Sequence, residues 1–143
     1  MKIGYFLDTG FLTLALTESL PGRWIKPWED IKKHRIKGYV IEPVIAETFY
    51  QLTKKGIVKQ KAIEDIFKMK SIKSMNIISN LEDDDSFLAG TYHNRFEKLS
   101  SVDCYVLATA RRLKLKIYTT DEPMARAARD IGISCEYYEI LFK

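Results

Sequence analysis

The chain has 143 residues, and its 46% hydrophobic and 29% charged residues are typical of one globular domain. A net charge of +4 permits a polyanionic partner such as a nucleic acid, but a charge this small does not require one. No apolar stretch approaches the roughly 20 residues that cross a bilayer, and the opening MKIGYFLD is too short and too soon charged for a signal peptide. We therefore expect a cytoplasmic protein with no membrane association.

The cysteines, histidines and tryptophans are interpreted as structural. Cys104 and Cys135 lie in apolar stretches, which favours buried, reduced thiols. The two histidines are far apart and there is no C-x-x-C pattern, so no zinc site is expected. Trp24 and Trp28 are expected to pack in the core or in a dimer interface rather than to stack on bases.

Apolar runs alternate with amphipathic stretches in the first half of the chain. The first predicted helix is stopped by Pro21-Gly22, and the second ends in the basic run 32–35, which suits a helix C-terminus. Pro43 opens the third helix, where its missing N–H costs nothing, and Gly56 closes it. In chain order we expect strand 2–7, helix 9–19, helix 24–35, strand 39–41, helix 43–55, helix 59–72 and strand 75–78.

The second half repeats this alternation and opens with a run of acids. Glu82 to Asp85 could suggest metal ligands, but acids just before a helix more commonly cap it and complement its dipole. Gly132 ends the last predicted helix. In chain order we expect helix 87–97, helix 100–113, strand 115–119, helix 124–130 and strand 134–138.

Strands that alternate with helices are connected by crossovers, and crossovers join parallel strands. The pattern therefore predicts an α/β fold, a three-layer α/β/α sandwich with a central, largely parallel sheet. We expect it to form a single domain over residues 1–143. In such sheets the ligand site lies beyond the carboxyl ends of the strands, where the strand order reverses. Acids that follow strands are consequently the first candidates for a site.

Two acids follow predicted strands. Asp8 comes directly after strand 2–7, and Asp121 lies between strand 115–119 and a helix. Each could simply be a helix N-cap, whose side-chain oxygen accepts a hydrogen bond from a free backbone N–H. If the two strands are neighbours, both acids would also project into the same crevice.

Two further acids lie near helix starts. Glu47 is one turn inside its helix and borders the apolar stripe, so it could be a boundary residue. Asp103 lies in the first turn of a helix that is apolar nearly all round, and it could complete a capping box with Ser100. A capping role does not exclude metal binding, because a helix N-terminus also stabilises an anion. The apolar stripe beside Glu47 is assigned to Ile45, Phe49 and Leu52.

A cluster of four carboxylates requires cations. Side chains about 5 Å apart would repel by roughly 3 kcal/mol per pair at an effective dielectric near 20, so the cluster persists only when cations or protons neutralise it. Ligation by carboxylate oxygens alone favours Mg²⁺ or Mn²⁺. These ions activate water and stabilise the leaving oxygen in phosphodiester hydrolysis. The candidate catalytic and metal-binding residues are Asp8, Glu47, Asp103 and Asp121.

Four segments resemble the PIN-domain family and, within it, the VapC-like toxins: FLDTGFL around Asp8, EPVIAETFYQL around Glu47, LSSVDCYVLATARRL around Asp103 and KIYTTDEPMARAARDIGI around Asp121. The resemblance covers nearly the whole chain, and the last two segments are its specific part. It implies an α/β/α sandwich whose acidic pocket binds Mg²⁺ or Mn²⁺ with these four acids. It also implies an endoribonuclease that cuts RNA, often a homodimer, whose toxin members are restrained by a cognate antitoxin.

The resemblance extends to residues around the acids. Thr119, two residues before Asp121, resembles a hydroxyl residue that would support an acid by hydrogen bonding. Gly10 departs from the family pattern, because members commonly carry Ser or Asn there, so one supporting hydrogen bond would be missing. Cations that would steer RNA phosphates are expected at Arg111, Arg112, Lys114 and Lys116, although a charge run is often only a solvated face.

Other functional classes remain open at this point. A PIN fold with a degenerate pocket would serve as an RNA-binding or scaffold module, and a housekeeping RNA-processing nuclease would cut without an antitoxin. A flavodoxin-like phospho-acceptor domain would need adjacent acids after the first strand, and a dehalogenase-type phosphatase would need D-x-D there. Asp8-Thr9-Gly10 satisfies neither requirement.

Overall fold

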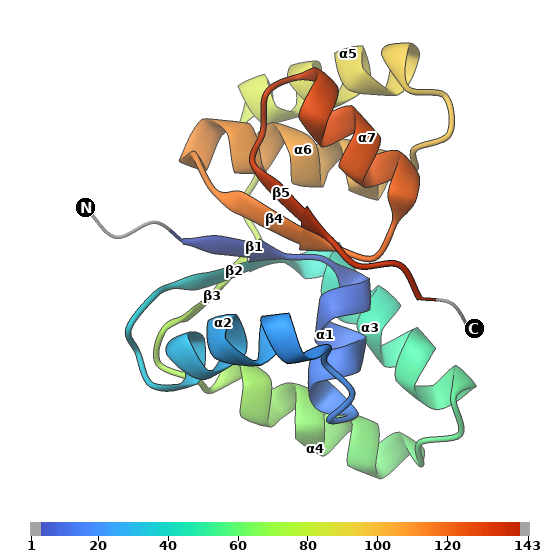
Figure 1. Cartoon of the computed structure of the whole chain (residues 1–143). Helices are drawn as coiled ribbons and strands as arrows, with labels where there is room; N and C mark the ends of the chain where they lie inside the picture. Colours follow the sequence, from blue (N-terminus) through green and yellow to red (C-terminus); the bar gives the residue numbers. More distant parts are fainter. Residues whose placement is uncertain (1–3, 141–143) are drawn as a thin grey trace.

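The computed structural model describes residues 4–140, and at its centre lies a sheet of five strands in the order β3-β2-β1-β4-β5 (Figure 1). Every neighbouring pair in this sheet is parallel. The strands are β1 (Tyr5–Leu7), β2 (Gly38–Ile41), β3 (Met75–Ile78), β4 (Lys116–Thr119) and β5 (Cys135–Tyr137). The helices are α1 (Thr9–Leu16), α2 (Gly22–Lys32), α3 (Glu42–Lys54), α4 (Lys59–Lys70), α5 (Asp83–Arg95), α6 (Ser101–Leu113) and α7 (Glu122–Asp130).

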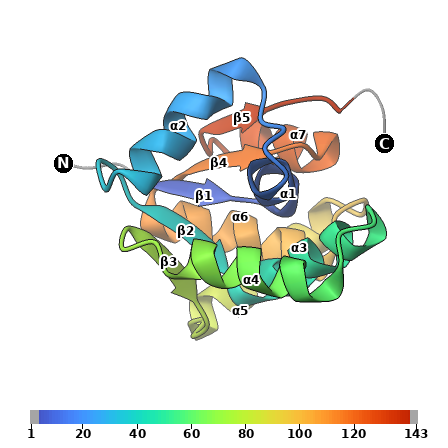
Figure 2. The same cartoon turned by 90° about the horizontal axis from the view of Figure 1, so that it is seen from below.

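Helices cover both faces of the sheet. Figure 1 shows α1 to α4 on one side and α5 to α7 on the other, and Figure 2 shows α2 toward β4 and β5, with α3 and α4 toward β2 and β3. From β1 the chain adds β2 and β3 on one side of the sheet and β4 and β5 on the other side. Because crossovers between parallel strands are right-handed, the helices that connect the strands of the two halves lie on opposite faces. The predicted α/β/α sandwich is confirmed, and its sheet is wholly parallel. Within 4–140, no helix is both long enough and apolar enough to span a bilayer.

The predicted elements are present, and their ends differ for local reasons. α5 begins earlier than predicted, at Asp83, because Glu82 and Asp85 form a capping box that brings the acidic run into the first turn. α1 ends earlier than predicted, because Glu18 adopts a left-handed φ of 54° just after it. Residues 2–3, which belong to the first predicted strand, lie outside the described part of the chain.

Aromatic rings build the core between α1, α2 and the sheet. The rings of Phe11 and Trp24 are fully buried, with centroids 5.3 Å apart. Trp24 also meets Tyr118 of β4 edge-on at 5.5 Å, an arrangement that the charge distribution of aromatic rings favours. Trp28 contacts Phe11 from the next turn of α2 and is 8% exposed. Of the two predicted places, core or dimer interface, the structure places both tryptophans in the core.

The two cysteines are free and separate. Cys104 is fully buried in α6, whereas Cys135, at the start of β5, is only half-buried. Burial raises the pKa of both thiols, that of Cys135 to about 11, so both stay protonated near neutral pH. Both cysteines are free, as expected; Cys104 is also buried as expected, whereas Cys135 is less buried than predicted.

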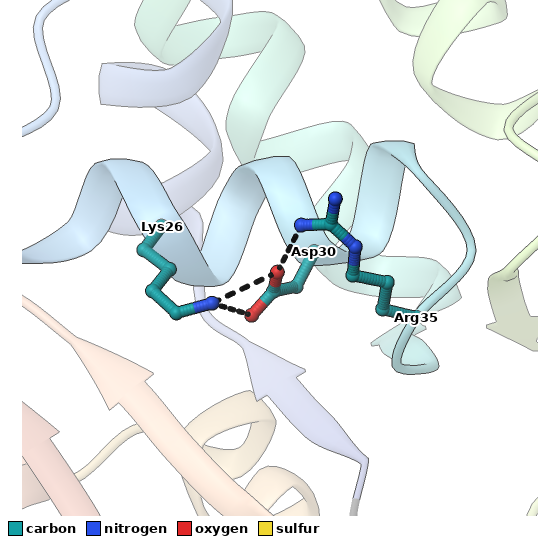
Figure 3. A network of polar contacts seen from close by, with 3 residues as sticks. All are labelled: Lys26, Asp30 and Arg35. Carbon is teal, nitrogen blue, oxygen red and sulfur yellow. Dashed lines mark hydrogen bonds and ion pairs between the residues drawn. The ribbon is translucent and has the colours of Figure 1, made fainter.

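One carboxylate fixes the end of α2 (Figure 3). Asp30 accepts hydrogen bonds from Lys26, one turn earlier, and from Arg35, just beyond the helix, each at 3.1 Å. These two cations lower the pKa of Asp30. The network joins the last turns of α2 to the loop that enters β2, at the edge of the sheet opposite the carboxyl ends of the strands.

Candidate active site

The strand order reverses between β1 and β4, which is where ligands bind in open parallel sheets. Asp8 is the residue after β1 and is only 7% exposed. Its Oδ1 accepts a hydrogen bond from the Thr9 N–H at 2.8 Å, so Asp8 is the N-cap of α1. Its Oδ2 accepts a hydrogen bond from the hydroxyl of Thr119 at 2.8 Å. Asp8 is therefore a helix cap and also a buried carboxylate at the reversal.

Thr119, the last residue of β4, connects the ends of the two strands. Its side chain is fully buried, its hydroxyl donates to Asp8, and its Oγ1 accepts the backbone N–H of Asp121 at 3.0 Å. Asp121 in turn caps α7 by accepting the Met124 N–H at 3.3 Å. The acid whose side chain bonds to Thr119 is thus Asp8, directly after the neighbouring strand, and this contact connects the two acids.

Asp103 belongs to the capping box predicted at the start of α6. Ser100 Oγ accepts the Asp103 N–H at 3.1 Å, and Asp103 Oδ2 accepts the Ser100 N–H at 3.2 Å. The side chain is half-buried, and the positive end of the helix dipole favours its negative charge. As with Asp8, the capping role and a place in the pocket coexist.

Glu47 lies on an exposed face of α3, and the buried stripe beside it differs from the predicted one. Thr48 occupies a core position because its hydroxyl donates to the Val44 carbonyl at 2.7 Å, which satisfies the polar group locally. Within residues 4–140, the side chain of Glu47 forms no hydrogen bond or salt bridge, so it is free to move toward a ligand. The buried residues of α3 are Val44, Thr48 and Leu52, while Ile45 and Phe49 flank them half-buried.

All four predicted acids line one pocket of about 720 Å³. Its walls are the start of α1, one face of α3, the start of α6 and the loop between β4 and α7. Across residues 4–140, no three histidine, cysteine or acidic side chains are already arranged as a metal-ligand group. Three of the four carboxylates instead bond to backbone N–H groups at helix starts. The structure brings Asp8, Glu47, Asp103 and Asp121 to the same hollow.

The carboxylates in this pocket influence one another. Burial, together with the negative charges of Asp103 and Asp121, raises the pKa of Asp8 to about 6 against the opposing hydrogen bonds from Thr119 and Thr9. Burial and the negative charges of Asp121 and Glu47 also raise the pKa of Asp103. The pocket thus carries more negative charge than its surroundings stabilise. A hard divalent cation fits such a donor set, which consists of carboxylate oxygens alone.

The family model of the PIN domain matches residues 5–130, a span that contains all four acids. The chain belongs to the PIN-domain family. PIN domains are generally nucleases, so this membership supports a hydrolase. No curated protein matches the sequence.

Solved structures share this PIN fold at low sequence identity. VapBC2 from Rickettsia felis, bound to a DNA fragment from its promoter, has a TM-score of 0.72 and 17% identity over 96% of this chain and 100% of that chain. VapC20 from Mycobacterium tuberculosis, a sarcin-ricin loop cleaving toxin, has a TM-score of 0.65 and 18% identity over 86% of this chain and 94% of that chain. A toxin–antitoxin complex from Klebsiella pneumoniae has a TM-score of 0.62 and 18% identity over 95% of this chain and 99% of that chain. At these identities the likeness shows the fold.

The arginines expected to steer RNA do not line the pocket of this PIN domain. Arg111 and Arg112 lie in the last turn of α6, whereas Asp103 lies in its first turn. Arg112 instead forms a two-point ion pair with the buried Asp85 of α5, at 2.8 and 2.9 Å. Arg111 donates a hydrogen bond at 2.8 Å to the hydroxyl of Tyr92, which also belongs to α5. Both arginines therefore join α5 to α6 rather than facing the acids.

The predicted lysines are also distant from the acids, and two other lysines line the pocket. Lys114 caps the far end of α6 and Lys116 begins β4, at the amino edge of the sheet. The cations that line the pocket are Lys54 and Lys55, at the end of α3. The sequence interpretation missed them, although they lie two turns beyond Glu47 on the same helix face.

Gly10 leaves space for a side chain from another part of the PIN domain. A Cβ at Gly10 would overlap the hydroxyl oxygen of Thr120 and lie 2.8 Å from its Cβ. Thr120 belongs to the loop between β4 and α7, and both residues line the pocket. A hydroxyl is therefore present beside position 10 even though residue 10 carries none.

We expect Gly10→Ala to destabilise the fold by about 1–3 kcal/mol, because the added methyl group must displace Thr120. The loss should be smaller in a Thr120→Ala background, which removes the overlapping hydroxyl. Gly90→Ala is the control: it lies inside α5 with nothing within 4 Å of its Cβ, so it should stabilise by about 0.5–1 kcal/mol. Urea unfolding measures these changes. A Gly10→Ala variant as stable as the wild type would contradict the close approach of Thr120.

Proposed function

We propose that this PIN domain is a divalent-metal-dependent endoribonuclease and the toxin of a toxin–antitoxin pair. The proposal rests on the convergence of four acids, from four separate segments, on one pocket at the reversal of strand order. Its partners in this proposal are an RNA substrate, a cognate antitoxin protein and a second copy of the chain in a homodimer, all in the cytoplasm. The likeness to toxin structures, one of them described as a sarcin-ricin loop cleaving toxin, supports RNA as the substrate class.

The pocket suits Mg²⁺ or Mn²⁺, and such an ion, when bound, supplies a water of lowered pKa and stabilises charge on the phosphodiester. Asp8 and Asp103 are the central ligands in this proposal, because burial and crowding oppose their ionisation until a cation is present. Glu47 completes the ligand set from α3, where its side chain is exposed. Asp121 orients the attacking water or holds a second ion.

The positions of these acids at helix starts support that role. Asp8 and Asp121 cap α1 and α7, and Asp103 lies in the first turn of α6, so the positive ends of three helix dipoles meet at the pocket. Helix N-termini also favour phosphate groups. Thr119 links the ends of β1 and β4, because its hydroxyl donates to Asp8 and accepts the backbone N–H of Asp121.

A nuclease assay and a growth assay together test the proposal. The purified chain should cut RNA in Mn²⁺ or Mg²⁺ and leave it intact in EDTA, and expression of the chain alone should arrest growth of a bacterial host. Metal-dependent cleavage without growth arrest would support a housekeeping nuclease instead of a toxin. Absence of metal-dependent cleavage would overturn the proposed nuclease activity and would favour an RNA-binding or scaffold module.

A further inference from the structure

One wall of the pocket carries opposite charges at its two ends. Glu47, Gln51, Lys54 and Lys55 all line the pocket from α3. Their spacing along the helix places them in one strip, which borders the buried face that holds α3 against the core. At a rise of about 1.5 Å per residue, Glu47 and Lys54 are roughly 10 Å apart along the helix axis. The wall therefore begins with an acid beside the other carboxylates and ends with two lysines.

The lysine end of this wall is available to a ligand. Both side chains are exposed, and among the residues that the structure describes neither forms a salt bridge. Lys54 Nζ lies 5.9 Å from the ring centroid of Tyr50, whose side chain is itself 56% exposed. Lysines at a helix C-terminus also complement the helix dipole, but that role would not require them to border the pocket.

A polyanion that approaches four carboxylates is repelled unless cations lie nearby. We propose that Lys54 and Lys55, with the Gln51 amide, bind a backbone phosphate of single-stranded RNA that flanks the phosphate held at the acids. The exposed ring of Tyr50 then offers a surface on which an unpaired base can stack. This site rests on the proposed nuclease function, because it places a second phosphate of the same substrate in the same pocket.

The salt dependence of RNA binding tests the site directly. A fluorescent single-stranded oligoribonucleotide is titrated with Asp103→Asn protein in EDTA, so that no cleavage occurs, at several salt concentrations. Adding Lys54→Ala and Lys55→Ala together should reduce the magnitude of the slope of log K against log salt by about 0.7, because the pair neutralises one phosphate of a single strand. In the active protein, the same pair should raise KM for RNA several-fold with kcat nearly unchanged. Hydrolysis of bis(4-nitrophenyl) phosphate in Mn²⁺ should not change, because that substrate has no flanking phosphate.

A second lysine pair in the chain provides a matched control. Lys32 and Lys33 end α2 as Lys54 and Lys55 end α3, and Lys32 Nζ lies 5.9 Å from the ring centroid of Trp28. This pair lies at the end of α2 that leads toward β2, away from the pocket lining. Replacing it with alanines should leave both the slope and KM unchanged.

The outcomes separate this site from the nuclease itself. An unchanged slope after loss of Lys54 and Lys55, an equal loss with the α2 pair, or no RNA binding by any variant would overturn the phosphate site. If the wild type cuts RNA but loss of Lys54 and Lys55 leaves the salt slope unchanged, the phosphate site is wrong and the nuclease proposal stands. If the wild type cuts no RNA, the nuclease proposal fails, and the slope comparison still decides whether these lysines hold RNA phosphates.

Discussion

Asp103→Asn should reduce metal-dependent RNA cleavage by roughly 10³-fold and leave the protein folded. The substitution removes the negative charge that a cation needs, but an amide oxygen can still accept the Ser100 N–H that the carboxylate accepts now. The capping box of α6 therefore keeps its geometry. Single-turnover cleavage of a labelled RNA in Mn²⁺ measures the loss, and circular dichroism confirms that the helices remain.

The control for this variant is an equal change of charge in another first helical turn. Asp84 lies in the first turn of α5, is exposed and does not line the pocket. Asp84→Asn should cut RNA at the wild-type rate. Full activity of Asp103→Asn, with metal still required, would remove Asp103 from the mechanism.

Asp8→Asn should stabilise the metal-free protein relative to the wild type as the pH rises from about 4 to about 7.5, by up to roughly 3 kcal/mol. The pKa of Asp8 is about 6 in the folded chain against an ordinary 3.8, so the folded state binds this proton more tightly than the unfolded state. The stability that this carboxyl contributes is complete below about pH 4 and is lost as the pH rises through about 6. Asparagine does not titrate, so urea unfolding of both proteins in EDTA isolates the effect.

Asp30→Asn provides a control of opposite sign. Lys26 and Arg35 lower the pKa of Asp30, so its contribution to stability is present at neutral pH and is lost as the pH falls. The Asp30 variant should therefore lose stability relative to the wild type at neutral pH and recover it in acid. A difference between Asp8→Asn and wild type that does not vary with pH would show that Asp8 titrates normally in the fold.

The fold and the acids could be predicted because their signals are local. Alternation of strands and helices indicated the parallel sheet, and the position of Asp8 and Asp121 after strands indicated the edge at which they meet. The capping box at Asp103 could be recognised from Ser100 three residues earlier. For Glu47 the local pattern was ambiguous, because Thr48 hides its hydroxyl inside the helix and shifts the buried stripe.

The cations could not be predicted, because their roles depend on contacts between distant elements. In the sequence, nothing near Arg112 indicates a partner for it. Its partner, Asp85, is brought into contact only by the packing of α5 on α6. Lys54 and Lys55 become significant only once Glu47 is known to face the pocket from the same helix. The space beside Gly10 is filled by Thr120, a residue from the opposite end of the chain.

β1, the first strand in the sequence, occupies the middle of the sheet between β2 and β4, and β4 follows it by more than 100 residues. A nascent chain that stops before β4 would leave one side of β1 without backbone partners, and it would lack the threonine and the aspartate that complete the acidic hollow. Prematurely terminated products therefore carry an open strand edge, the feature by which unfinished proteins associate with one another. A fragment that stops before β4 therefore lacks Asp121 and with it the complete set of four acids.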